Sequence, residues 1–357
     1  MPHGGRTGWA IGALIAACGI LQALPAADAS AGPRPAKDRS TPVAQAPSKP
    51  EPVLPSLVRS AVALQIALEA QGYSPGLVDG SPGPKTRIAL AAFQEASGLK
   101  ATGEADEATL ALLKCEPQGA FALVTLGAAD VADVDPPPKD WIERSRKRRL
   151  LYPSLSNLIA ERAHTTERFV SALNTDLDPA AFCAGSLLWV PAVKERRRFQ
   201  GTLERIEIDL ERRMVLLFAG PGGRGSGKIP VPAGILFCSI AADPAKAVPG
   251  ESKVAAVAAN PTYTFDPAKW PEVHGVDKKL LIPPGPRNPV GLRWIGLERE
   301  GVGIHGAPEP EMIGKTGSHG CFRLTNWDAI WLADLVQVGT PVKIIKSTAE
   351  SAWRWRG

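Results

Sequence analysis

Two histidines and one cysteine near the C-terminus are the residues of this sequence best suited to covalent chemistry. His305, His319 and Cys321 lie in one short stretch with glycines close to each. Free cysteine has a pKa of about 8.5, so little of it is thiolate at neutral pH, and a histidine within hydrogen-bond reach can take its proton. We therefore expect acyl transfer, with Cys321 as the nucleophile and His305 as the general base.

Three neighbours of the cysteine are expected to support that reaction. His319 shares the turn with Cys321 and is expected to orient the loop or to line the site of a tetrahedral oxyanion. The backbone N–H groups of Gly320 and Cys321 are expected to point toward that oxyanion, where one donor is typically worth about 100-fold in rate or more. Arg323 follows the nucleophile and is expected to hold a carboxylate of the substrate.

The same side chains admit other interpretations. His305, His319 and Cys321 are a chemically allowed set of zinc ligands, but the H-x-C spacing is cramped and no fourth ligand is obvious. Cys321 as an inert buried thiol is a second alternative. We expect neither a metal nor an organic cofactor, and we assign no role to His274.

A glycine-rich stretch imitates a nucleotide-binding motif. Residues 220–225 match G-x-G-x-x-G, and residues 222–228 match the first seven positions of a P-loop. Both motifs need a helix to begin next, so that its N-terminal N–H groups meet the phosphate. Ile229-Pro230-Val231-Pro232 follows instead, and prolines so close together exclude that helix. We therefore expect a hairpin here.

The elements around the chemical residues are expected to be mostly strands. Apolar residues alternate with charged ones over 206–210, which predicts a half-buried strand. Residues 214–218 read as the returning strand and 342–345 as a last one. The one convincing helix spans 326–336. These patterns predict a compact β sandwich or barrel with one helix.

The N-terminal half has helical periodicity. Leu57, Ala61, Leu64 and Leu68 recur at helical spacing, a second helix is expected to begin near Pro84, and a third near residue 106. This predicts a small all-α module of three helices over residues 56–116, near the lower size limit for an independent core.

The remaining segments read as targeting and connecting sequence. Residues 1–29 have an apolar run and an A-x-A pattern, typical of a cleaved export signal; an uncleaved anchor and lipidation at Cys18 are the alternatives. A proline-rich linker is expected over 30–55, a second linker over 117–140, and a Trp- and Arg-containing tail over 347–357. The basic run 144–149 is interpreted as a solvated face rather than a nucleic-acid patch.

Composition limits the class of protein. The chain has 357 residues, of which 44% are hydrophobic and 22% charged, with a formal net charge of +5. These values exclude wholesale disorder and a polytopic membrane protein. The positive charge favours an anionic environment without naming a partner.

The order of residue types over residues 56–116 is a more specific signal of a protein family than their helical periodicity. Leu64-Gln65, Gly72-Tyr73, Phe93-Gln94 and Gly98-Leu99 appear in one order, with Asp79-Gly80 among them. This closely resembles the peptidoglycan-binding domain of many cell-wall enzymes, which implies a shallow groove for wall glycan or stem peptide. A calcium loop at Asp79-Gly80 is the alternative, but the other carboxylates of an EF-hand are missing.

Residues 141–194 resemble a degenerate LysM domain, a second glycan binder with a βααβ plan. Leu155, Leu158 and Ile159 share a helical face, a helix is expected after residue 166, and Leu188-Trp189-Val190-Pro191 reads as the last strand. The first strand is poorly marked. A plain structural connector is the alternative.

The pattern H-G, a gap, then S-H-G-C-F-R-L resembles the YkuD-type L,D-transpeptidase catalytic domain, over about residues 200–346. The resemblance implies that Cys321 is the nucleophile and His305 the general acid and base, supported by His319 and Gly320. It implies substrate-binding roles for Ser318, Arg323 and Gly306. Residues 235–259 depart from the family pattern, which leaves the structure of the lid region and the acceptor specificity open. We expect the catalytic loop to be unaffected.

The resemblance also implies a reaction. Cys321 would attack the bond between the diamino acid and D-Ala of a peptidoglycan tetrapeptide stem, release D-Ala, and pass the acyl group to an amine. The acceptor would be another stem, giving a 3-3 crosslink, or an outer-membrane lipoprotein; with water the protein would be an L,D-carboxypeptidase. A non-catalytic wall-binding scaffold and a zinc-dependent wall hydrolase are the other classes.

The same resemblance implies partners and a compartment. We expect an exported monomer in the periplasm or cell envelope, which binds peptidoglycan stems and glycan, binds no nucleic acid, acts in wall synthesis and cell shape, and is acylated by carbapenems. Cys115, Cys183 and Cys238 permit one disulfide whose pairing stays open. Cys321 is expected to stay free.

Overall fold

The computed structural model describes residues 48–196, 202–228, 230–270 and 273–347. The expected export signal, the linker up to residue 47 and the tail from residue 348 lie outside these ranges. Among the helices of the described ranges, none has the length and apolar character needed to cross a membrane.

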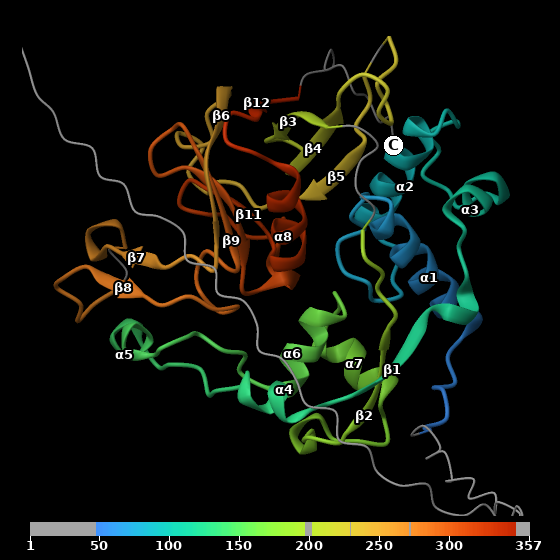
Figure 1. The fold of residues 1–357 in the computed structure, drawn as a ribbon, viewed down its shortest axis with the longest axis horizontal. Coiled ribbons are helices and arrows are strands. Elements are labelled where there is room, and N and C mark those ends of the chain that lie inside the picture. Colours follow the sequence, from blue (N-terminus) through green and yellow to red (C-terminus); the bar gives the residue numbers. More distant parts are fainter. Residues whose placement is uncertain (1–47, 197–201, 229, 271–272, 348–357) are drawn as a thin grey trace, which may run out of the picture. The chain divides into compact units, whose positions relative to one another are not determined.

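The C-terminal part is built on one eight-stranded sheet with the order β11-β10-β9-β6-β12-β3-β4-β5 (Figure 1). Neighbouring strands are antiparallel except for the pairs β10–β11 and β12–β3, which are parallel. In chain order the strands are β3 (Leu203–Asp209), β4 (Met214–Ala219), β5 (Gly234–Phe237), β6 (Gly250–Ala259), β9 (Arg293–Leu297), β10 (Gly303–Ala307), β11 (Phe322–Thr325) and β12 (Pro341–Ile345).

Helix α8 (Asn326–Leu335) covers one face of this sheet at β9, β10 and β11 (Figure 1). Ala329, Leu332 and Ala333 of the helix join a core with Ile206 and Ile208 of β3, both fully buried. Thr325 caps the helix, because its side chain accepts from the backbone N–H of Asp328. The expected mainly-β domain with one α-helix is confirmed.

Three helices form the expected N-terminal module: α1 (Ser56–Ala70), α2 (Pro84–Ala96) and α3 (Glu107–Leu113). Its glutamines hold the loops between the helices. Gln65 accepts from the backbone N–H groups of Asp79 and Gly80, and the buried Gln94 accepts from those of Thr102 and Gly103. The motif Asp79-Gly80 is therefore a turn tied to α1.

The helical module packs on the other face of the sheet. Strand β4 is buried along its whole length because its two faces enter different cores. Val215 and Leu217 pack beneath α8, whereas Met214, Leu216 and Phe218 pack against Leu64, Leu68 and Phe93 of the helical module. The backbones also pair, since Ser74 N–H donates to Ile235 O at 2.9 Å and Ile235 N–H to Gly72 O at 3.1 Å.

The segment between these parts contains a two-stranded antiparallel sheet. Strands β1 (Phe121–Thr125) and β2 (Leu187–Pro191) pair, and four α-helices lie between them in the chain, among them α6 (Leu155–Arg162) and α7 (Glu167–Leu173), so the order differs from the βααβ plan expected over 141–194. The first strand lies inside 117–140, where we expected a linker, as does helix α4 (Ala128–Ala132). Phe121–Thr125 is a short apolar run that only pairing with β2 identifies as a strand.

A hairpin and a short helix form an aromatic lobe. Strands β7 (Tyr263–Phe265) and β8 (Leu280–Ile282) pair, and α5 (Trp141–Arg146) lies beside β8. Trp141 stacks on Phe265 with ring centroids 4.1 Å apart, and Trp270 lies 5.6 Å from Trp141. We call these residues, with Tyr263, the aromatic lobe.

A buried arginine joins three parts of the chain. Arg196, after β2, donates to Asp328 of α8 at 2.5 Å and to Glu69 of α1. Glu69 also bonds Nδ1 of His164 at 2.9 Å. Burial alone would raise the pKa of Glu69, but the neighbouring His164 and Arg196 outweigh it and lower that pKa to about 2. We call Glu69, Arg196 and Asp328 the buried triad.

Candidate active site

His305 lies on β10, and Cys321 lies at the start of the neighbouring parallel strand β11. Cys321 directly precedes β11, and the register of the two strands places His305 opposite Arg323. Residues in register on parallel strands, and residues two apart on one strand, face the same side of a sheet. His305 on β10 therefore faces the same side as the loop end that carries Cys321.

The thiol of Cys321 is held by backbone groups. It donates a hydrogen bond to Gly301 O at 3.4 Å and accepts one from the N–H of Gly303. Burial raises the pKa of the thiol, against the Gly303 N–H and the charge of Arg323, which lower it. The resting cysteine is therefore the neutral thiol.

His305 is buried and in one tautomer. Its Nδ1 lies 2.6 Å from Gly306 O, and because a carbonyl oxygen can only accept, Nδ1 carries the proton. Nε2 then keeps its lone pair. The ring stacks on Trp294, with centroids 5.6 Å apart. Burial lowers the pKa of His305 to about 4, so the ring is a neutral base at physiological pH.

The loop before Cys321 is fixed from within. The hydroxyl of Ser318 donates to Cys321 O and accepts from the N–H of Gly320 at 3.3 Å. Arg323 donates to Gly317 O and, at 3.2 Å, to Thr316 Oγ1. Ser318 and Arg323, which we expected to bind substrate, therefore shape the catalytic loop in this structure.

The segment that departs from the family pattern contacts this loop directly. Ser318 N–H donates to Ile240 O at 2.7 Å, and Ala242 N–H donates to Ser318 O at 2.8 Å. Ser239 and Arg323 exchange two backbone hydrogen bonds of 2.9 Å. The sequence did not indicate this contact between residues 235–259 and the catalytic loop, because long-range pairing joins segments that the sequence separates.

The other predicted residues have distinct surroundings. Gly306 is buried, and a Cβ there would lie 2.2 Å from Asn326 Oδ1. His319 is exposed, and its ring lies 4.0 Å from that of Trp270. Because His305 faces Gly306 O and His319 faces the aromatic lobe, these two histidines point at different neighbours. In the described ranges no three His, Cys, Asp or Glu side chains are close enough to hold a metal ion.

The aromatic lobe lies beside the catalytic loop, since Trp270 contacts His319, which the sequence did not indicate. Trp270 Nε1 donates to the hydroxyl of Tyr263 at 3.2 Å. The pKa of Tyr263 is raised, first by burial and further by the nearby Cys321. Trp294 and Trp270, which contact the two histidines, were also missed, since their signal is only that tryptophan is frequent at binding surfaces.

Cys115, Cys183, Cys238 and Cys321 are all free thiols in the structure. Cys238 is fully buried next to the segment that pairs with the catalytic loop, and burial raises its pKa to about 12.

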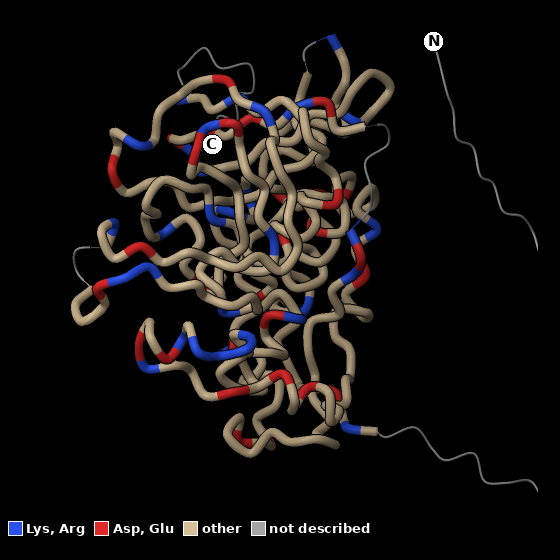
Figure 2. The backbone as a smooth tube through the Cα atoms, turned by 60° about the vertical axis from the view of Figure 1, so that its left-hand side comes forward, with Lys and Arg blue, Asp and Glu red and all other residues tan. Residues whose placement is uncertain are grey.

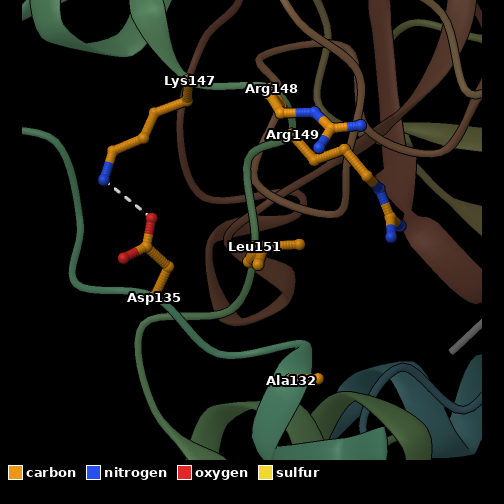
Figure 3. Close-up of a pocket in the computed structure, with 6 residues that line it drawn as sticks. All are labelled: Ala132, Asp135, Lys147, Arg148, Arg149 and Leu151. Carbon is orange, nitrogen blue, oxygen red and sulfur yellow. Dashed lines mark hydrogen bonds and ion pairs between the residues drawn. The ribbon is translucent and has the colours of Figure 1, made fainter.

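A basic pocket lies outside this site. It has a volume of about 370 Å³ and is lined by Ala132, Asp135, Lys147, Arg148, Arg149 and Leu151 (Figure 3). Lys147 pairs with Asp135 at 2.7 Å, while Arg149 lies 3.6 Å from Asp133. Figure 3 shows the side chains of Arg148 and Arg149 extending to the same side. Elsewhere Lys and Arg are interspersed with Asp and Glu along the chain (Figure 2).

Two family models match the chain. Residues 204–344 match the L,D-transpeptidase catalytic domain (YkuD), and residues 60–113 match a putative peptidoglycan-binding domain. The resemblance to both families is confirmed.

Curated relatives are similar over part of their length. The putative L,D-transpeptidase YqjB of Bacillus subtilis is 36% identical over 100 residues, which are 27% of this chain and 49% of the relative. The probable L,D-transpeptidase YbiS of Escherichia coli is 37% identical over 105 residues, 28% of this chain and 34% of the relative. The putative L,D-transpeptidase YkuD of Bacillus licheniformis is 44% identical over 61 residues, which are 17% of this chain and 37% of the relative. The chain thus spans between a third and a half of these relatives.

Solved structures of L,D-transpeptidases align with the chain at low scores. One from Xylanimonas cellulosilytica has a TM-score of 0.32 and 16% identity, and the alignment covers 84% of this chain and 100% of the other. The catalytic domain of the L,D-transpeptidase from Enterococcus faecium acylated by ertapenem has a TM-score of 0.28 and 23% identity. That alignment covers 40% of this chain and 98% of the other.

Proposed function

We propose that this chain is an L,D-transpeptidase of the cell wall. The observation that carries the proposal is a thiol that directly precedes β11 and a neutral, buried histidine on the neighbouring strand β10, both inside the residues that match this catalytic family. The helical module, which matches a peptidoglycan-binding domain, supports peptidoglycan as the substrate.

The first step forms an acyl-enzyme. The thiol proton of Cys321 passes to Nε2 of His305 while Sγ attacks the carbonyl between the diamino acid and the terminal D-Ala. The C–N bond breaks, the D-Ala amine takes the proton from His305, and a thioester on Cys321 remains. Because both partners start neutral, the attack separates charge. The N–H of Cys321 is proposed to stabilise the oxyanion, together with the N–H of Gly320 once that N–H exchanges the Ser318 hydroxyl for the oxyanion.

The second step uses an amine acceptor. Its amine attacks the thioester, His305 takes the amine proton and returns a proton to the Cys321 sulfur as the C–S bond breaks. An acceptor from another stem gives a 3-3 crosslink, and an amine of an outer-membrane lipoprotein tethers that membrane to the wall. Water in the same place gives L,D-carboxypeptidase activity.

The compartment follows from the substrate. Peptidoglycan lies outside the cytoplasmic membrane, and residues 1–29 read as an export signal. We propose that the protein acts in the cell envelope as a monomer.

Muropeptide analysis tests this function. Purified walls are incubated with the wild type and with Cys321→Ala, and the digested products are identified by mass spectrometry. New 3-3 dimers, lipoprotein-linked stems or tripeptides from the wild type alone identify the acceptor as stem, lipoprotein or water. Identical products from the two proteins would overturn the proposal and favour a non-catalytic wall-binding protein.

A further inference from the structure

A buried carboxylate from the segment between β1 and β2 reaches the C-terminal domain. Glu161 of α6 has 8% exposure, and its Oε1 accepts from Asn326 Nδ2 at 3.0 Å and from the hydroxyl of Tyr152 at 3.1 Å. Glu161 lies outside residues 204–344, which match the catalytic family, and the proposed reaction does not use it.

Asn326 connects that carboxylate to the strand of His305. Its Oδ1 accepts from Leu292 N–H at 3.0 Å, and its Nδ2 also donates to Pro286 O at 3.2 Å. The amide fills the space beside Gly306, where a Cβ would lie 2.2 Å from Oδ1. Gly306 in turn supplies the carbonyl that accepts from His305 Nδ1.

The orientation of this amide depends on its acceptors. An asparagine side chain can exchange the places of its oxygen and nitrogen by turning over. Leu292 offers a donor on one side, whereas Glu161 and Pro286 offer acceptors on the other. Only one orientation satisfies all three, and an unsatisfied buried group costs about 1–3 kcal/mol.

We propose that Glu161 is a positioning residue for the Cys321–His305 pair. It holds the Asn326 amide in one orientation, the amide holds β10 at Gly306, and the Gly306 carbonyl holds His305 in the tautomer that leaves Nε2 free. This inference rests on the proposed function and deepens it, because a segment outside the catalytic family would then set the catalytic histidine.

The role of Glu161 is that of an acceptor and does not need its charge. Burial raises the pKa of Glu161 to about 6, against the hydrogen bonds from Asn326 and Tyr152 and the charges of Arg287 and His164. A protonated carboxyl still offers one acceptor oxygen. Glutamine offers the same oxygen, so Glu161→Gln is the conservative variant and Glu161→Ala removes the acceptor.

The experiment measures acylation of the purified full chain by a carbapenem, followed by intact-protein mass spectrometry from pH 4 to 9. We expect Glu161→Gln to react within about 3-fold of the wild type and Glu161→Ala at least about 10-fold more slowly. The acid limb of Glu161→Ala should move to lower pH than that of the wild type, because the ring loses the Gly306 carbonyl, the partner that raises the pKa of the buried His305. Val170→Ala, in the core of the same segment, is the matched control and should keep the wild-type profile.

The results separate the two proposals. If the wild type is not acylated, the proposed function fails. If Glu161→Ala reacts with the wild-type rate and pH profile, or if Val170→Ala loses as much, the positioning role is overturned and the transpeptidase proposal stands.

If Glu161→Ala does not fold, the positioning role can be tested by exchanging the hydrogen-bond donor and acceptor between residues 326 and 161. Asn326→Asp places two acceptors opposite each other and should react at least about 10-fold more slowly. Adding Glu161→Gln restores a donor, now on residue 161, and should recover several-fold of the rate. A double variant as slow as Asn326→Asp alone would overturn the positioning role.

Discussion

At the scale of single residues, the proposed chemistry depends on a pair that is neutral at rest. Burial lowers the pKa of His305 and raises that of Cys321, so neither group carries charge before substrate binds. The candidate catalytic residues themselves could be proposed from the H-G and S-H-G-C motifs. Their protonation states could not, because these depend on burial and on backbone partners from Gly301, Gly303 and Gly306.

Carbapenem acylation should therefore persist into mild acid. With a pKa of about 4, the His305 ring is deprotonated and able to accept a proton above that pH. The rate should fall only below about pH 5 and should rise toward high pH, where the thiol ionises more readily. Rates from pH 4 to 9 check this, with His305→Gln as a control that should be slow throughout. An acid limb centred near pH 6.5 would contradict it.

Gly306→Ala should disable the site by crowding. The added Cβ would lie 2.2 Å from Asn326 Oδ1, so either the amide or β10 must move. We expect at least about 10-fold slower acylation and a loss of about 1–3 kcal/mol of stability. Gly119→Ala, which meets no atom within 4 Å, is the matched control for both measurements. Equal losses in the two variants would exclude crowding as the cause.

At the scale of elements, the longer helices and the strands β2, β3, β4 and β12 were readable, whereas the other described strands and the pairing of the strands were not. The helical periods and the alternation over 206–210 match α1, α2 and β3. Strand β1 was missed because a run as short as Phe121–Thr125 is a weak signal, and its partner β2 lies far along the chain. The continuous apolar run of β4 was the one sign that both faces of the sheet are covered.

The buried triad should make stability sensitive to acid. The folded-state pKa of Glu69 is about 2, below its unfolded value of 4.5. Ionised Glu69 therefore contributes on the order of 3 kcal/mol to the free energy of unfolding above pH 4.5, and this contribution is lost as the pH falls toward 2. Thermal unfolding of the wild type and of Glu69→Gln from pH 2.5 to 7 checks this. The two curves should converge in acid; a constant difference would contradict the linkage.

Replacing Arg196 should lower the free energy of unfolding more than replacing one carboxylate of the buried triad. Arg196→Met leaves Glu69 and Asp328 buried without their cation, which typically costs about 3–5 kcal/mol. Adding Glu69→Gln and Asp328→Asn to Arg196→Met should recover part of this loss. Chemical denaturation of the three proteins measures it, and no recovery would show that the charges are not the cause.

At the scale of the whole molecule, the helical module is a structural part of the sheet that carries the site. Met214, Leu216 and Phe218 are covered by its side chains, and Lys85 of α2 donates to Ile313 O at 2.8 Å, at the start of the catalytic loop. The two families could each be identified from sequence. Their packing could not, because it depends on side chains that only the folded chain brings together.

Unfolding of the full chain should therefore be one cooperative transition. Calorimetry should give a single peak, and a chain without residues 48–116 should aggregate because it exposes the β4 side chains. Two separated transitions, or a soluble and folded truncated chain, would contradict this.

The docking of the helical module has a consequence for the geometry of the wall. A wall-binding domain on a flexible tether would let one bound enzyme sample stems at many distances. Here the backbone pairing of Ser74 with Ile235 and the buried triad keep the domain and Cys321 at one separation. The proposed enzyme would then select, among neighbouring glycan strands, those whose spacing equals its own dimension, so the mesh size of the wall becomes a determinant of its substrate choice.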